Sequence, residues 1–324
     1  EALGIGEGCD VIVTPRSFVA SAACVVRLGS RPVFADVSID SQNISAETVE
    51  AALTPRTRAI VVVHHAGWPC DMDPIMELAV QNNLAVIEDC AQAHGATYKG
   101  RPVGSIGNIG AFSFCQDKIM STGGEGGMVV TGDEEIWKKA WAIKDHGKSY
   151  DAVFKQQHPP GFRWLHDTFG TNMRMTEIQA AIGRVQLGKL HEWVDLRKKN
   201  ADKLIETLTR FSSMRVPVPD HDVRHAYYRL YAFVESGRLA TGWSRDRIME
   251  EIVTRGVPCF SGSCPEIYNE RAFVENNLQP AEPLPNAVSL GSSSLAFLVH
   301  PTLSEANIEF MCGVILDVLH KATA

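Results

Sequence analysis

Short apolar runs alternate with helical patterns along the chain as far as Asp145. The runs are rich in Val and Ile and bounded by Gly, Pro or Asp; they cover Val11–Val13, Pro32–Val37, Ala59–His64, Leu84–Asp89, Gly110–Cys115 and Gly127–Thr131. Such runs are typical of strands buried on both faces. Ser45–Leu53, which begins with a good N-cap, and Asp73–Asn82, with apolar residues at helical spacing, predict helices between them. The alternation predicts an α/β fold with a mostly parallel sheet flanked by helices.

The pattern changes after Asp145. Residues His146–Asp167 contain Gly and Pro and are expected to form a loop, and Thr176–Leu208 has a long helical pattern. Beyond the break at Pro217–Pro219 come a predicted strand, a helix, an apolar stretch and a final helix, at Tyr227–Val234, Arg245–Arg255, Leu295–His300 and Ser304–Leu319. We therefore expect a large domain over residues 1–200 and a smaller C-terminal α+β domain over residues 201–324.

Composition and charge exclude several classes of protein. The 324 residues are 45% hydrophobic and 21% charged, which is the balance of a chain that buries a sizeable core. The 31 basic and 38 acidic residues give a net charge of −7, without the basic surplus of a protein that binds nucleic acid through its phosphates. No segment approaches the roughly 18 uncharged apolar residues of a membrane span. These features favour an ordinary globular protein.

The cysteines and histidines do not suggest a metal site. The eight cysteines are scattered without a C-x-x-C pair, which predicts reduced thiols in a cytoplasmic protein. His64, His65 and His94 have a spacing that fits no zinc pattern. We therefore expect no bound metal.

Two polar residues lie at the ends of neighbouring predicted strands. Asp89 ends an otherwise apolar strand, and Lys118 follows the next strand and precedes the glycine-rich segment Thr122–Gly127. In open parallel sheets, ligands bind at the carboxyl ends of the strands. Taken singly, Asp89 could be a cap and Lys118 a surface residue before a flexible turn. The segment lacks both the phosphate-loop order G-x-x-x-x-G-K-[ST] and the Rossmann order G-x-G-x-x-G, so nucleotide hydrolysis and hydride transfer lose support.

Together, an Asp and a Lys at adjacent strand ends favour one cofactor. Pyridoxal 5′-phosphate (PLP) binds a lysine as a Schiff base and pairs its pyridinium nitrogen with an aspartate. A carboxylate beside that nitrogen raises its pKa and keeps it protonated. The two residues therefore predict a PLP site.

Five segments, in order, resemble the DegT/StrS family of sugar aminotransferases. They are Thr14–Ala20, Val63–Asp73, Ile87–Ala96, Phe112–Thr131 and Thr171–Glu177, and the resemblance extends over nearly the whole chain. The central pair matches the E-D-x-A-Q-x-x-G-A segment of the family and its lysine segment. The resemblance implies the fold-type-I PLP aminotransferase architecture and a homodimer with shared active sites.

Carried over to this chain, the resemblance assigns roles to three residues of the predicted core of the site. Lys118 would form the Schiff base and later carry the proton between the amino-acid carbon and the cofactor carbon. Asp89 would hold the pyridinium nitrogen. Gln92 would bond the phenolic oxygen of the ring.

Other residues follow from the same resemblance. Phe18 would stack on the cofactor ring, although without the family it could equally be a core aromatic. Ser113 would bond the phosphate, and Asn172 would reach the phosphate of the neighbouring subunit's cofactor. Arg174 is a candidate for contacting substrate. The family's Gly-Thr phosphate-binding segment precedes the equivalent of Leu3–Gly6, so we expect the native protein to have residues before Glu1.

The implied reaction moves an amino group from an amino acid, with L-glutamate as the expected donor, to a keto group of a nucleotide-linked sugar. The His65–Gly67 segment resembles enzymes that aminate position 4 of 4-keto-6-deoxy sugars. Cys259–Tyr268 and Leu298–Thr302 resemble members of bacterial surface-polysaccharide pathways such as O-antigen synthesis. We expect a UDP-linked N-acetylhexosamine, with a dTDP-hexose as the rival. The alternatives are another fold-type-I PLP enzyme that acts on amino acids and a non-catalytic, regulatory relative.

Overall fold

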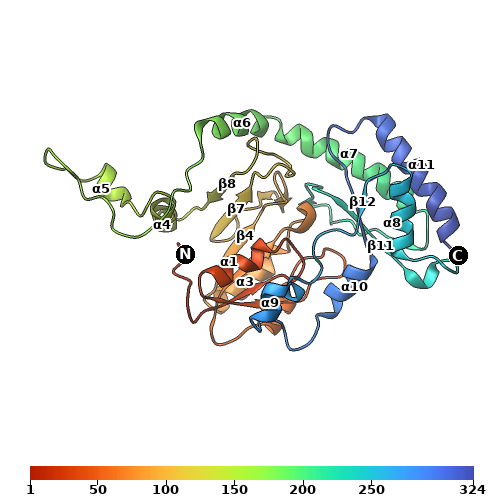
Figure 1. The fold of residues 1–324 in the computed structure, drawn as a ribbon, viewed down its shortest axis with the longest axis horizontal. Helices are drawn as coiled ribbons and strands as arrows, with labels where there is room; N and C mark the ends of the chain where they lie inside the picture. Colours follow the sequence, from red (N-terminus) through yellow and green to blue (C-terminus); the bar gives the residue numbers. More distant parts are fainter.

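A six-stranded sheet forms the centre of the computed structural model, which describes residues 1–324 (Figure 1). Its order is β2-β1-β3-β4-β7-β8, and only the last pair is antiparallel. The strands are β1 (Asp10–Val13), β2 (Arg31–Phe34), β3 (Thr57–Val63), β4 (Ala85–Asp89), β7 (Ile109–Ser113) and β8 (Gly127–Val130). The predicted α/β fold with a mostly parallel sheet is confirmed, and each predicted apolar run overlaps one of these strands.

Helices cover both faces of this sheet. Successive side chains of a strand point to opposite faces, so each apolar strand presents apolar side chains to the helices on either side. Ile60 and Val62 of β3 face one apolar cluster, and Val61 and Val63 face another. The first cluster includes residues of α2 (Ala46–Ala51), α3 (Met72–Gln81) and α10 (Pro285–Ser293), and the second includes residues of α1 (Ala20–Arg27) and α9 (Arg271–Glu275). Strands buried on both faces explain the continuous hydrophobicity of the runs.

A second, antiparallel sheet belongs to the C-terminal part of the chain. Its order is β12-β13-β11-β9, and its strands are β9 (Met214–Arg215), β11 (Leu230–Val234), β12 (Cys259–Phe260) and β13 (Ser294–Phe297). It shares an apolar core with α7 (Leu190–Leu208), α8 (Arg245–Thr254) and α11 (Glu305–Ala322). The domain boundary predicted between residues 200 and 201 falls within α7, and its exact position stays a prediction.

Short elements join the two parts. A small sheet has the order β10-β5-β6 and pairs β10 (Val223–Arg224) with β5 (Thr97–Tyr98), which pairs with β6 (Arg101–Pro102). The segment before β11 also hydrogen-bonds to the turn after β3, since Tyr228 N donates to Ala66 O at 2.8 Å and Ala226 N donates to Gly67 O at 2.9 Å. The remaining short helices are the 3₁₀ turns η1 (His65–Gly67), η2 (Ser236–Arg238) and η3 (Ile267–Asn269).

An arm extends away from the central sheet (Figure 1). It includes α4 (Glu134–Lys144) and α5 (Tyr150–Phe154), and the chain then returns through α6 (Glu177–Leu187). The expected loop at His146–Asp167 therefore contains a short helix, which Ser149 caps by accepting a hydrogen bond from Ala152 N.

The long helical pattern over Thr176–Leu208 forms two helices, α6 and α7, with a break between Leu187 and Leu190. The backbone bonding tightens at the break, where Lys189 N donates to Gln186 O at 2.9 Å. Gly188 lies at this point, and glycine has a low helix propensity. None of the helices in the structure combines the length and the apolar character that crossing a membrane requires.

Candidate active site

The carboxyl ends of β4 and β7 lie side by side at one edge of the central sheet. The two strands are parallel, and Asp89 at the end of β4 pairs in register with Ala111 of β7. Antiparallel β8 begins opposite Ser113 at Gly127, so the glycine-rich segment lies at the same edge. The strand pairing thus brings together the two segments on which the predicted chemistry depends.

The Asp89 carboxylate is held from two sides. The Ser21 hydroxyl of α1 donates to Oδ2 at 2.8 Å, and the backbone N–H of Ala91 donates to Oδ1 at 3.1 Å. Ser21 is itself 3.1 Å from the hydroxyl of Ser17. These two hydrogen bonds, one to each oxygen, fix the orientation of the carboxylate.

Lys118 lies between a carboxylate and an aromatic ring. Its side chain is only 15% exposed, with Nζ 3.5 Å from Oδ1 of Asp117 and 5.2 Å from the centre of the Tyr228 ring. The Tyr228 hydroxyl donates to Oδ2 of Asp117 at 2.6 Å. These contacts limit the directions in which the lysine amine can point.

The pKa values of the two neighbours of Lys118 move in opposite directions. Burial acts to raise the pKa of Asp117, but the hydrogen bond from Tyr228 and the nearby Lys118 charge outweigh it and hold that pKa below its ordinary value. Burial, together with the hydrogen bond to Asp117, raises the pKa of Tyr228. Asp117 is therefore an anion beside the lysine, and Tyr228 stays protonated.

Gln92 has a fixed orientation beside the turn after β3. Its side chain is buried, and its Oε1 accepts a 2.7 Å hydrogen bond from the backbone N–H of Ala66. Because the carbonyl oxygen is occupied in this way, the amide nitrogen is the atom that remains to donate to a ligand.

The other predicted site residues have different surroundings. Phe18, just before α1, is 67% exposed, and Ser113 accepts a 3.3 Å hydrogen bond from Cys115 N at the end of β7. Asn172 is exposed beside the arm, and its Oδ1 accepts from the backbone and Nε of Arg174. The structure therefore brings Asp89, Ser113 and Lys118 to one edge, whereas Asn172 makes no hydrogen bond with any of them.

Arg174 is engaged within the arm. Its Nη1 lies 3.4 Å from Oδ1 of Asp145, which also contacts Lys148 at 3.1 Å. The guanidinium of the candidate substrate residue is thus paired with a carboxylate of its own chain.

A buried cluster under the same edge has side chains of metal-ligating type. His64, Glu88 and Cys90 lie with their potential ligand atoms within 4.8 Å of one another. However, Nδ1 of His64 accepts from Cys70 N at 3.0 Å, so Nε2 carries the hydrogen that it donates to Glu88 at 3.0 Å. The hydrogen bonds therefore occupy both nitrogens of the imidazole.

Glu88 itself is fully satisfied. Its carboxylate also accepts from the backbone N–H groups of Gly104, Ile106 and Gly107 at 2.7, 2.7 and 2.6 Å. Burial acts to raise its pKa, but the hydrogen bonds from His64 and the backbone outweigh it and lower that pKa. The cluster therefore fits a structural role, in which Glu88 fixes the loop before β7.

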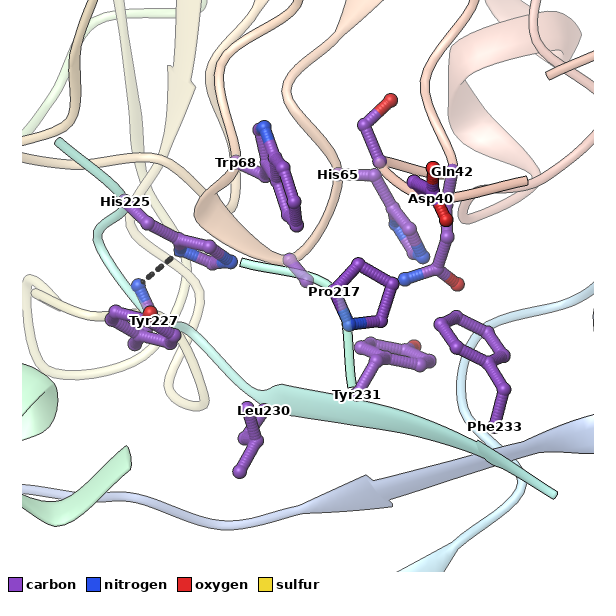
Figure 2. Close-up of a pocket in the computed structure, with 12 residues that line it drawn as sticks. Asp40, Gln42, His65, Trp68, Pro217, His225, Tyr227, Leu230, Tyr231 and Phe233 are labelled. Carbon is purple, nitrogen blue, oxygen red and sulfur yellow. Dashed lines mark hydrogen bonds between the residues drawn. The ribbon is translucent and has the colours of Figure 1, made fainter. Parts of the chain in front are cut away.

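A small pocket lies between the turn after β3 and the start of β11 (Figure 2). Its lining includes His65, Trp68, His225 and Tyr231. Burial lowers the pKa of His225 to about 3, and its Nδ1 accepts a 2.7 Å hydrogen bond from Tyr227 N. Burial also holds the pKa of His65 well below its ordinary value. Both imidazoles are therefore neutral, and the pocket offers no histidine cation.

His94 is also a neutral, buried imidazole. Its ring packs 5.4 Å from the Phe112 ring and 5.8 Å from the Phe114 ring, measured between centroids. Burial lowers its pKa to about 4, and the nearby charge of Lys118 adds to the shift. A cation at this position is thus excluded over the ordinary pH range.

Sequence reasoning missed the residues that surround Lys118. Tyr228 lies 110 residues further along the chain, and no local motif connects it to the lysine. Arg197 of α7 fixes its backbone by donating to the carbonyls of Tyr227 and Tyr228 at 3.2 and 3.3 Å. Only Asp117, directly before Lys118, carried a local signal, because a carboxylate adjacent to a lysine can pair with it.

Comparisons with known proteins agree with this geometry. A family model described as the DegT/DnrJ/EryC1/StrS aminotransferase family matches residues 1–315. GDP-perosamine synthase from Caulobacter vibrioides is 34% identical over 320 residues, which are 98% of this chain and 81% of that protein. UDP-N-acetyl-3-dehydro-alpha-D-glucosamine 3-aminotransferase from Acidithiobacillus ferrooxidans is 34% identical over 319 residues, with 98% and 80% covered.

A solved structure is also similar along nearly the whole chain. An aminotransferase from Psychrobacter cryohalolentis has 55% sequence identity and a TM-score of 0.97, covering 98% of this chain and 83% of that one. At this level of similarity, the central sheet and its flanking helices are the same fold.

Proposed function

The chain belongs to the DegT/DnrJ/EryC1/StrS aminotransferase family, and from this membership we propose the reaction that it catalyses. The enzyme is a PLP-dependent sugar aminotransferase. In the proposed reaction, the amino group of L-glutamate is transferred to the 4-keto group of a 4-keto-6-deoxy sugar linked to UDP. The product would serve the synthesis of a bacterial surface polysaccharide such as O-antigen.

The proposed position of amination rests on the segment His65–Gly67, which resembles enzymes that act at position 4. The Acidithiobacillus relative is named as a 3-aminotransferase, so a keto group at position 3 is the alternative acceptor. The name of the Caulobacter relative adds GDP to UDP and dTDP as nucleotides to be tested.

The residues present fit PLP. The Asp89 carboxylate is oriented by Ser21 and Ala91 and lies at a strand end, where it can face a pyridine nitrogen. Lys118 follows the neighbouring strand with its amine confined by Asp117 and Tyr228. Gln92 has an amide nitrogen left to donate, and Phe18 exposes its ring. This set of an acid, an amine, an amide and an aromatic face is the observation that carries the proposal.

When bound, PLP supplies an aldehyde that accepts amines and a ring that accepts electrons from a carbanion. Asp89 would hold a proton on the pyridine nitrogen, because a carboxylate beside that nitrogen raises the pKa of the nitrogen. Gln92 would donate an amide hydrogen to the phenolic oxygen. The backbone N–H of Ala91 holds the Asp89 carboxylate, and that of Ala66 holds the Gln92 amide, so both side chains are oriented before a ligand binds.

Lys118 would hold the cofactor through its amine between turnovers and then act as the acid and base of the reaction. As a neutral amine Lys118 would take the α-proton of the donor, and as an ammonium it would hold that proton and release it again within the site. General acid–base transfer of this kind contributes on the order of 10² to 10⁴ in rate. The same group would run these transfers in reverse when the keto sugar is aminated.

Three further residues complete the proposed site. The exposed Phe18 ring would cover one face of the cofactor, and Ser113, at the end of β7, would donate to the phosphate. Asn172 would bind the phosphate of the partner subunit's cofactor, which explains why it has no contact with Lys118 in one chain.

We propose that the enzyme is a homodimer in which the arm meets the partner. Apolar side chains on the arm are left uncovered in a single chain, since Phe162, Trp164 and Phe169 are 78%, 82% and 99% exposed. Phe162 and Trp164 pack against each other with 5.2 Å between ring centroids, and exposed apolar patches of this kind mark interaction surfaces.

All eight cysteines are free, which supports a reducing compartment, the cytoplasm.

Product analysis tests the proposed reaction. Purified enzyme is incubated with PLP, L-glutamate and each of the candidate keto sugars, and the products are identified by mass spectrometry and NMR. The proposal requires an amino group at position 4 of a UDP-linked 4-keto-6-deoxy sugar. Amination at position 3, or turnover only with a GDP- or dTDP-linked sugar, would contradict the finer assignment and leave the family assignment standing.

A further inference from the structure

Arg229 contacts the same aromatic ring as Lys118 and has no carboxylate partner. Its guanidinium carbon is 5.4 Å from the centre of the Tyr228 ring and 4.8 Å from the centre of the Phe260 ring. Lys118 Nζ is 5.2 Å from the same Tyr228 ring. No Asp or Glu oxygen comes within the 4.0 Å that defines an ion pair with Arg229.

The neighbouring cations are already engaged. Lys118 faces Asp117, and Arg197 donates to the carbonyls of Tyr227 and Tyr228. The only carboxylate that contacts the Tyr228 side chain is Asp117, which also accepts the tyrosine hydrogen bond. Two cationic side chains, Lys118 and Arg229, therefore contact one ring, and Asp117 is the carboxylate hydrogen-bonded to its hydroxyl. Such an excess of positive charge attracts an anionic ligand, and Arg229 is the cation of the two that has no carboxylate partner.

The two rings also fix where that guanidinium lies. Phe260 belongs to β12 and Tyr228 precedes β11, so two elements hold the side chain from different parts of the chain. Stacking on aromatic faces orients the planar group and leaves its N–H edge free to donate. An arginine that is held in this way binds a carboxylate through two parallel hydrogen bonds at low entropic cost.

The position of Arg229 indicates which anion it meets. In the proposed reaction the donor amine reacts at the place of the Lys118 amine, and the α-carboxylate is bonded to the same carbon as that amine. An anion-binding group that shares an aromatic contact with Lys118 is therefore placed for the donor. The diphosphate of a nucleotide sugar is separated from its keto carbon by several bonds, which makes it the less suitable ligand.

We propose that Arg229 binds a carboxylate of the amino donor and so determines the preference for amino acids as donors. This assignment rests on the proposed function. Arg229 is distinct from the predicted cofactor ligands. It would bind the substrate in place of Arg174, whose guanidinium is paired with Asp145.

Equilibrium binding of glutarate tests the proposal, because glutarate has the two carboxylates of glutamate and no amine to react. The probe is titrated by calorimetry into the PLP-loaded enzyme and into Arg229→Gln and Arg229→Lys. For Arg229→Gln we expect the Kd for glutarate to rise about 10- to 100-fold, the range for one charge-assisted hydrogen-bonded pair. Arg229→Lys keeps the charge and loses the fork, so its Kd should lie between the two.

Two controls separate the proposal from general effects. Arg247→Gln removes another arginine that stacks on an aromatic ring. Arg247 belongs to α8 and lies 4.3 Å from the centre of the Trp243 ring, so this variant should leave the Kd for glutarate unchanged. Thermal unfolding reports whether each variant is folded. If Arg229→Gln does not fold, Arg229→Met retains the stem that packs on the rings and replaces it in the comparison.

Titration with UDP, which carries a diphosphate, distinguishes the two sources of the anion. Weaker glutarate binding with unchanged UDP binding supports the proposal. Three results for the variants would overturn it: weaker UDP binding with unchanged glutarate binding, an equal loss of affinity for both probes, or no loss of affinity for either. A wild-type enzyme that does not bind glutarate would overturn it as well. The visible spectrum of the wild-type enzyme with PLP and glutamate tests the proposed function separately, since it does not depend on the Arg229 variants.

Discussion

The hydroxyl of Tyr228 donates a 2.6 Å hydrogen bond to Asp117, the residue directly before Lys118. This bond joins the segment that precedes β11 to the lysine segment that follows β7. The same tyrosine ring lies against the lysine amine, so one residue orients both the carboxylate and the amine. The proposed acid–base group is therefore held by a part of the chain far away in sequence.

Replacing Tyr228 with Phe should change the pH dependence of turnover. Burial acts to raise the pKa of Asp117, and the hydrogen bond from Tyr228 is the largest effect that lowers it, so this pKa should rise in Tyr228→Phe. Because ionised Asp117 holds the Lys118 amine, activity is lost as the pH falls through the pKa of Asp117. We expect kcat to fall about 3- to 10-fold and the acid limb of the kcat profile to move to higher pH. An unchanged profile would contradict the role assigned to this pair.

Replacing Ser21 with Ala should weaken the binding of PLP. The Ser21 hydroxyl is one of the two donors that hold the Asp89 carboxylate, and its loss leaves the carboxylate less well oriented. We expect the Kd for PLP to rise about 5-fold, as for the loss of one modest hydrogen bond. Ser292→Ala removes an exposed serine of α10 and serves as the control. Equal Kd values for the two variants would show that Asp89 does not depend on Ser21.

Replacing Glu88 with Gln should destabilise the fold. The carboxylate accepts from His64 and three backbone N–H groups, whereas the amide nitrogen of Gln cannot accept and would face a donor. Leaving a buried donor unsatisfied in this way costs about 1 to 3 kcal/mol. Urea unfolding at pH 7 measures the loss.

The effect of Glu88→Gln should also depend on pH. The pKa of Glu88 in the folded protein is lower than its ordinary value, although burial acts to raise it. Its contribution to stability is therefore complete above the ordinary value of about 4.3 and is lost as the pH falls through the lower, folded-state pKa. The difference between wild type and variant should shrink in acid; a constant difference from pH 7 to pH 3 would refute the assignment.

Treatment with a chelator should leave the stability of the enzyme unchanged. Both nitrogens of His64 and the carboxylate of Glu88 are occupied by hydrogen bonds, so a metal would have to displace them. Thermal unfolding before and after EDTA measures the effect. A drop in Tm that zinc restores would establish the His64–Glu88–Cys90 cluster as a metal site.

Replacing Phe169 with Glu should weaken the proposed dimer. The side chain is 99% exposed in one chain, and a charge buried in an interface is costly. Light scattering should give a smaller mean mass for the variant at low concentration. Val80→Glu introduces the same charge at an exposed apolar position of α3 and should leave the mass unchanged. Equal masses for the two variants and the wild type would place the arm outside the interface.

The central sheet could be predicted because its strands are buried on both faces and their hydrophobicity is continuous. The helix at Ala20–Arg27 was missed, since small residues such as Ala22 and Ala23 give a weak helical pattern. Two-residue strands such as β5 and β12 are too short to carry a pattern. The break at Gly188 depends on a single glycine within an otherwise continuous helical pattern.

The site could be predicted in part. Asp89 and Lys118 stand at strand ends, where sequence position alone implies proximity to a ligand. Tyr228 and Arg229 could not be found, because the contact of the Tyr228 ring with both Lys118 and Arg229 depends on how the second sheet packs and not on local sequence around Lys118. The buried Glu88–His64 pair was hidden for the same reason, since its partners lie on neighbouring strands.

The visible absorption spectrum of the purified protein tests the central claim most directly. Spectra are recorded with added PLP, before and after L-glutamate, for the wild type and Lys118→Ala. The account predicts a yellow absorption band in the wild type that bleaches with glutamate, and neither the band nor the bleaching in Lys118→Ala. A wild-type band that glutamate leaves unchanged, or a Lys118→Ala variant that behaves like the wild type, would contradict the assignment of Lys118 as the acid–base group of an aminotransferase.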